Sequence, residues 1–179
     1  MIEGADAAGE TIAGIRALAL SHAAALAGSG ARDEALATLQ PARRRLGITR
    51  PARLRPLGRV WRLGALLLGA DGALYGTGDV VRAEQPARRS VVALAVAERR
   101  ELQAAALRGG FPAGETVNFN AVPVDVDRLQ RTGESGPLVT REGVAFVRWS
   151  ATQPEALAEL SGYLMDRAEL LAHPPSGAG

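Results

Sequence analysis

The sequence contains no cysteine, no lysine and only two histidines, and these absences exclude several classes of function. Without cysteine the chain can form no disulfide, no thiolate metal ligand and no cysteine nucleophile. Without lysine it can supply no P-loop lysine, no Schiff base and no serine–lysine catalytic pair. His22 and His173 lie near opposite ends of the sequence and form no local metal-binding motif. We therefore predict neither a metal ion nor a cofactor.

Long apolar runs are also missing. The longest, LGALLLGA at residues 63–70, has eight residues, whereas a membrane-spanning helix needs about 20. The N-terminal stretch MIEGADAAGE is acidic and unlike a signal peptide. We therefore expect a cytoplasmic protein without a membrane partner. With 179 residues, 47% of them hydrophobic, the chain is predicted to form a single domain with one core.

Acidic residues are absent between Glu34 and Asp71, and this part of the chain is rich in arginine. The net charge is only +2, because residues 1–35 carry two arginines against five acids and residues 71–179 carry eleven against fourteen. The positive charge is therefore local. Its eight arginines are Arg43, Arg44, Arg45, Arg50, Arg53, Arg55, Arg59 and Arg62.

Two interpretations of this arginine-rich segment are open. The segment can form an anion-binding surface that contacts phosphates of nucleic acid or another polyanion. Alternatively, Arg43 to Arg45 solvate the end of a preceding helix, while Arg59 and Arg62 pair with acidic residues later in the chain.

Three helices are predicted in the sequence before residue 110. Ile12, Ile15, Ala19, Ala23 and Leu26 recur at helical steps before the glycines at 28 and 30. A second helix is expected over residues 32–40, until Pro41 interrupts it, which gives a helical N-terminal region at residues 1–50. Residues 95–108 form a third helical pattern, which ends at a pair of glycines.

A fourth helix is predicted behind Pro154, and the remaining patterns are those of strands. Pro51 and Pro56 favour an extended connector. Residues 59–81 read as a β-hairpin with a two-residue turn at Asp71-Gly72, and residues 137–149 as another with its turn at Glu142-Gly143.

A further strand is expected at residues 116–124. Together these elements predict an α+β fold, in which one small antiparallel sheet of two hairpins and a connecting strand carries helices on one side. This core spans residues 51–173, and residues 174–179 form a disordered tail. Trp61 and Trp149 lie beside alternating apolar residues and are expected in the core.

Polar residues gather in GETVNFNAVPVDVDRL, residues 114–129. Asn118 and Asn120 share one face of a strand, and the carboxylates around them can act as Mg²⁺ ligands or as acid–base groups. The alternative is a solvated sheet face that runs into a helix cap at one of the aspartates. The full candidate cluster is Glu115, Asn118, Asn120, Asp125 and Asp127.

The stretch GESGPLV around Ser135 resembles the nucleophile loop of chymotrypsin-like proteases but lacks the second glycine that shapes the oxyanion hole. Glycine, serine and proline before a strand are also ordinary turn residues. We therefore interpret this stretch as a turn.

Residues 53–83, 97–119, 136–150 and 163–175 resemble a set of uncharacterised short proteins of high-GC bacteria, some of which are automatically labelled glutaminase. The resemblance implies glutamine hydrolysis as one function. It carries over no catalytic residue, because the chain has neither the serine–lysine pair nor the cysteine on which known glutaminases rely. The residues themselves favour a small binding or interaction module with an anionic or protein partner, and glutamine hydrolysis is the alternative.

Overall fold

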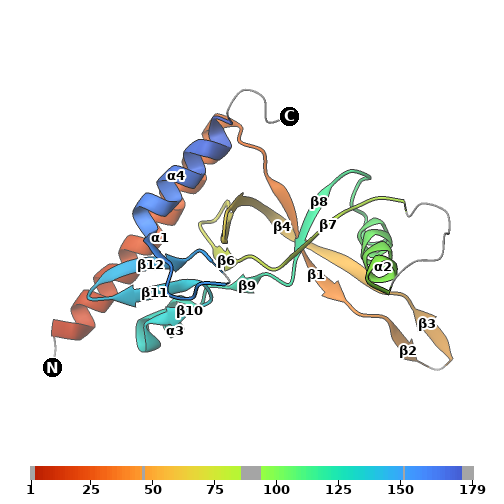
Figure 1. The fold of residues 1–179 in the computed structure, drawn as a ribbon, viewed down its shortest axis with the longest axis horizontal. Coiled ribbons are helices and arrows are strands. Elements are labelled where there is room, and N and C mark those ends of the chain that lie inside the picture. The colour runs from red at the N-terminus through yellow and green to blue at the C-terminus, as the bar shows by residue number, and fades with distance from the viewer. Residues whose placement is uncertain (1–2, 46, 86–93, 151, 175–179) are drawn as a thin grey trace. The chain divides into compact units, whose positions relative to one another are not determined.

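The computed structural model describes residues 3–45, 47–85, 94–150 and 152–174, and these fold as an α+β protein, as predicted (Figure 1). They divide into two compact units. Unit 1 is made of Met1–Asp33, Val60–Thr77 and Val122–Gly179, and unit 2 is made of Glu34–Arg59 and Gly78–Ala121. The boundary that we predicted at residue 50 coincides with none of these divisions.

Unit 1 contains three helices and two sheets. Its helices are α1 (Glu3–Ser29), α3 (Val126–Thr132) and α4 (Leu160–Ala172). Four strands of a seven-stranded sheet supply the first, in the order β4-β5-β6-β9: the end of β4 (Arg53–Leu63), β5 (Leu66–Gly69), β6 (Leu74–Gly76) and β9 (Val122–Pro123). The other has the order β10-β11-β12-β13, formed by Glu134–Ser135, Leu138–Arg141, Val144–Arg148 and Leu157–Glu159.

The core of unit 1 forms around α1. The predicted helical stripe is confirmed, because its five residues, Ile12, Ile15, Ala19, Ala23 and Leu26, are all buried. They pack with buried side chains of β5 and of α4, which lies beside α1 (Figure 1). By length and composition, Thr11–Ser29 is also apolar enough to cross a membrane. Its alanines and leucines raise the mean hydropathy of the segment, although they form no long uninterrupted run. The buried stripe gives this segment a role in the core.

The hairpin predicted at residues 137–149 is confirmed as β11 and β12. The hairpin predicted at residues 59–81 is confirmed only around its turn, where β5 pairs with β6. Its first strand is wrong, because the chain folds back at Gly64 and Ala65 so that β4 pairs with β5, and its second strand ends at Gly76. The two hairpins lie in separate sheets. Glu142 and Gly143 form the two-residue turn between β11 and β12, and both have positive φ, at 50° and 77°. The turn between β5 and β6 is longer than predicted. The N–H of Gly69 donates to the carbonyl of Ala73, and the N–H of Gly72 to that of Gly69, which encloses three residues with Gly72 at φ 77°.

Unit 2 is built on the mixed part of the seven-stranded sheet, with the strand order β7-β8-β1-β4. It uses β1 (Glu34–Gln40), the first part of β4, β7 (Asp79–Arg82) and β8 (Thr116–Phe119), while β2 (Arg43–Arg45) and β3 (Ile48–Arg50) form a separate two-stranded sheet. Helix α2 (Leu94–Arg108) contacts β7 and ends directly before the pair of glycines at 109 and 110, as predicted. The core of unit 2 includes Leu54, Ala106, Val117 and Phe119.

The predicted helix at residues 32–40 is wrong, because Glu34–Gln40 is strand β1. Its Ala35 and Leu36 pair in parallel with Val117 and Asn118 of β8. Glutamate, alanine and leucine favour a helix locally, but burial of three consecutive side chains against distant strands overrides that preference. The helical N-terminal region therefore ends at Ser29.

Two further predictions need correction. Helix α4 begins at Leu160 and not behind Pro154, because Leu157–Glu159 pairs with β12 as strand β13. Trp61 is buried as predicted, but Trp149 is 49% exposed, since β12 ends at Arg148 and the inward alternation stops there. Residues 175–179 of the predicted disordered tail lie outside the described residues.

Candidate nucleic-acid interface

Three of the eight arginines of the acid-free segment begin an antiparallel ribbon, β2 and β3, that lies apart from the other strands of unit 2 (Figure 1). The register pairs Arg43 with Arg50, Arg44 with Thr49 and Arg45 with Ile48. Gly47, at φ 79°, completes the two-residue connection between the strands. The predicted connector is thus extended, but it is folded back on itself. We call Arg43–Arg50 the arginine ribbon.

The arginine ribbon exposes cations on both faces. Residues paired across two antiparallel strands share a face, so Arg43 and Arg50 lie together on one face, while Arg44 and Thr49 lie on the other. All four side chains are exposed, and Ile48 is exposed to 68%. Within the described part of the chain, no carboxylate lies within ion-pair distance of Arg43, Arg44 or Arg50. Like charges directly opposite each other destabilise a strand pair, and nothing described offsets that cost.

The first part of β4 continues the exposed cations. Arg53 and Arg55 are exposed and alternate with Leu54, which is fully buried in the core of unit 2. The start of this strand is held by Arg108, whose Nε donates to the carbonyl of Ala52 at 2.7 Å. Like the ribbon arginines, Arg53 and Arg55 have no carboxylate partner among the residues that the structure describes.

Arg59 and Arg62 differ from these five arginines. Nη1 of Arg59 lies 3.0 Å from a carboxylate oxygen of Glu115, as the pairing interpretation of the segment predicted. Arg62 is half-buried and also has a partner within the protein. The other half of that interpretation is wrong, because the segment before Arg43 is strand β1 and not the helix that we predicted there. The side chain of Arg45 lies outside the described residues, so the candidate anion-binding group narrows to Arg43, Arg44, Arg50, Arg53 and Arg55.

The candidate polar cluster is divided between the two units. In unit 2, Asn118 is fully buried and its Nδ2 donates to Glu34 Oε2 at 2.7 Å and to the carbonyl of Ala35 at 3.2 Å. It thus secures the parallel β1–β8 pair. Asn120 follows the strand at φ 54°, and its Nδ2 donates to Asp79 Oδ2 at 2.8 Å. The amides therefore have structural partners.

The two aspartates of the cluster belong to unit 1. Asp125 is the N-cap of α3 and accepts a hydrogen bond from the N–H of Arg128 at 2.8 Å, which is the helix cap given as the alternative. Asp127 lies in the first helical turn, where a carboxylate is favourable. Among the described residues, no three His, Asp or Glu side chains are grouped so that they could hold a metal ion.

Ser135, in the protease-like stretch, is buried and accepts a hydrogen bond from the backbone N–H of Asp125 at 2.8 Å. Its hydroxyl therefore supports the loop that precedes α3. The next residue, Gly136, has φ 55° and lies in the tight turn that joins β10 to β11. This geometry agrees with our interpretation of the stretch as a turn.

The arginines lie on paired strands, which we did not predict. A usable signal was present, because a glycine at position 47 stands between the arginine triplet and the β-branched pair Ile48 and Thr49. Comparison with known proteins adds no further indication: no family model, curated protein or solved structure matches this chain.

Proposed function

We propose that unit 2 binds nucleic acid through the arginine ribbon, with Arg53 and Arg55 as additional phosphate contacts. The observation that carries the proposal is the Arg43–Arg50 pair, in which two exposed guanidiniums face the same side of a ribbon without a carboxylate among the described residues. Phosphates on this face would offset the repulsion between the two guanidiniums, which no described carboxylate offsets.

The form of the ribbon also suits nucleic acid. The major groove of B-form DNA is wide enough to admit a two-stranded β-ribbon, and several known DNA-binding proteins use strands in this way. Arginine is well suited to the contact, because its planar fork of donors matches phosphate oxygens and the acceptor edge of guanine. The proposal includes the cytoplasmic location expected from the sequence. Glutamine hydrolysis stays the alternative prediction, and no feature of the described residues favours it.

The test measures binding to a labelled duplex DNA by fluorescence anisotropy over a series of salt concentrations. If the ribbon contacts phosphates, the logarithm of the affinity falls linearly with the logarithm of the salt concentration. Changing Arg43, Arg44 and Arg50 together to glutamine should reduce that slope by about one unit for each phosphate that the protein no longer binds. Folding should be almost unchanged, since exposed arginines contribute only about 0 to 1 kcal/mol.

A matched control separates the local effect of the ribbon from that of overall charge. Arg128, Arg131 and Arg141 are exposed residues of unit 1, and changing all three to glutamine lowers the net charge by the same amount. This control should keep both the affinity and the slope of the unaltered protein. Equal effects of the two triple changes, or no binding at ~50 mM salt, where such binding is strongest, would refute the proposal. Equally tight binding of heparin would reduce it to general polyanion binding.

A further inference from the structure

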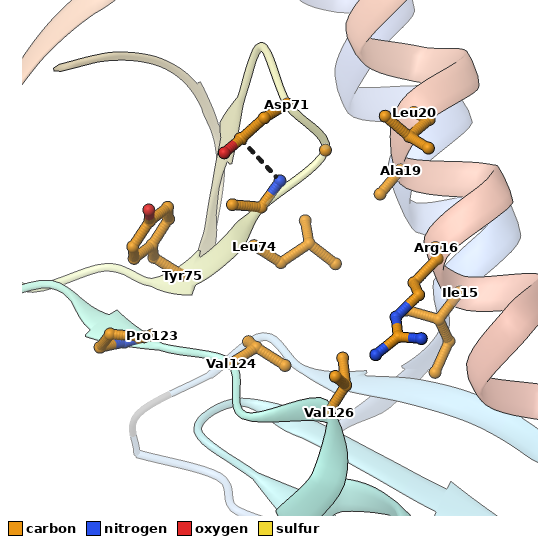
Figure 2. A pocket seen from close by; sticks show the side chains of 12 residues that line it. Ile15, Arg16, Ala19, Leu20, Asp71, Leu74, Tyr75, Pro123, Val124 and Val126 are labelled. Atoms are coloured by element: carbon orange, nitrogen blue, oxygen red, sulfur yellow. Dashed lines mark hydrogen bonds between the residues drawn. The ribbon is translucent and has the colours of Figure 1, made fainter.

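Unit 1 contains a pocket of about 350 Å³ that lies between α1, the β5–β6 turn and the chain leading from β9 into α3 (Figure 2). Its lining is mainly apolar. Pockets that bind small molecules usually have volumes of about 300 to 1,000 Å³, so this one is at the small end of that range. The apolar lining includes Ile15, Ala19, Leu20, Leu74, Val124 and Val126.

The turn and the helix approach each other closely at one edge of this pocket. A Cβ atom on Gly72 would come within 2.9 Å of the side chain of Leu20, and Gly72 also has φ 77°. Only glycine fits these two conditions without strain. Next to this contact, Ala19 presents only a methyl group to the pocket, and it is 1% exposed. The contact between Gly72 and Leu20 holds the β5–β6 turn against α1, and the small side chain of Ala19 leaves space for the pocket beside it.

Two charged residues, Arg16 and Asp71, line the pocket. The carboxylate of Asp71 is turned onto its own loop, where Oδ1 accepts a hydrogen bond from the N–H of Ala73 at 3.0 Å. The guanidinium of Arg16 extends from α1 into the space in front of Val126 (Figure 2). Within the described residues it makes no hydrogen bond or ion pair. The pocket thus combines an apolar wall with a cation that has no charged partner among the described residues.

We infer that this pocket binds a small carboxylic acid with an apolar body. The apolar part lies against Ile15, Leu74, Val124 and Val126, and the carboxylate pairs with the guanidinium of Arg16. A charge-assisted bond between guanidinium and carboxylate is stronger than a neutral hydrogen bond and can be bidentate. The inference concerns residues of unit 1 alone and does not depend on nucleic-acid binding by unit 2.

Octanoate and octanol make suitable probes, because they share the apolar chain and differ in charge. We expect saturable binding of octanoate at millimolar concentrations by isothermal titration calorimetry. Octanoate should also shift the methyl NMR signals of Ile15, Leu74 and Val126. Arg16→Gln should weaken octanoate binding about tenfold, because it removes an exposed charge-assisted hydrogen bond, and should leave octanol binding unchanged.

Arg131→Gln provides the matched control, since Arg131 is an exposed arginine of the same unit that does not line the pocket. It should bind octanoate as the unaltered protein does. Arg16 is itself exposed, so its replacement is expected to leave the fold intact, which circular dichroism checks. The inference is overturned if octanoate does not bind saturably, if its binding shifts methyl signals of residues outside the pocket and not those of its lining, or if Arg16→Gln binds it as tightly as Arg131→Gln.

Discussion

Replacement of Trp61 by alanine is expected to destabilise unit 1 by about 3 to 5 kcal/mol, the usual cost of removing a large aromatic side chain from a core. Trp61 is 6% exposed and packs in the core around α1. A tryptophan buries at most about 250 Å², which at about 25 cal/mol per Å² gives about 6 kcal/mol. That value is an upper limit, because the unfolded chain also buries part of this surface.

The indole makes one polar contact that a second variant isolates. Nε1 of Trp61 donates to the carbonyl of Ala31 at 3.1 Å. Trp61→Phe keeps most of the apolar surface but removes this hydrogen bond, so it should cost less than Trp61→Ala, about 1 to 2 kcal/mol.

Trp149 offers a control in the same unit, because it is 49% exposed. Trp149→Ala should cost no more than about half as much as Trp61→Ala, since about half of its surface is already in water. Urea unfolding followed by circular dichroism at 222 nm suits this comparison, because it does not depend on tryptophan fluorescence and three of the helices belong to unit 1. Equal costs for the two alanine variants would refute the assignment of Trp61 to the core.

The remaining predictions concern one ion pair and one glycine. The hydrogen bond and charge of Arg148 hold the pKa of Glu134 below its ordinary value of 4.5, so this pair stabilises the fold above that pH and loses its effect as the pH falls through the lowered pKa. Arg148→Gln should return the pKa of Glu134 toward 4.5, which an NMR titration of the Glu134 side chain would measure. A Cβ on Gly109 would lie 1.9 Å from the carbonyl oxygen of Leu54, so Gly109→Ala should cost about 2 kcal/mol in urea unfolding. Gly110→Ala, which meets no atom within 4 Å, should cost only the strain of φ 93°, about 1 kcal/mol.

The features that could be predicted from the sequence are those fixed by neighbouring residues. The turn at Glu142 and Gly143 requires positive φ at both positions, and the short polar pair between two apolar alternations indicates it directly. The buried stripe of α1 follows from helical spacing alone, and the end of α2 follows from the glycine at 109.

The features that could not be predicted depend on partners far away in the chain. Glu34–Gln40 is a strand only because β8 lies beside it, and nothing in its own residues indicates this pairing. The candidate polar cluster was grouped by closeness in sequence, but Asn120 belongs to unit 2 and Asp125 to unit 1. The exposure of Trp149 depends on where β12 ends, and alternation of apolar residues gives no end point.

Strand β4 passes from unit 2 into unit 1 between Arg59 and Val60, and this connectivity constrains how the protein is made and how it can be divided. During synthesis β1 leaves the ribosome long before its partner β8, and α1 waits longer still for α4, so neither core can close early. A continuous fragment that holds all of unit 2 also includes Val60–Thr77 of unit 1. Such a fragment would expose Leu66 and Leu68, which are fully buried in the core around α1, and would therefore tend to aggregate.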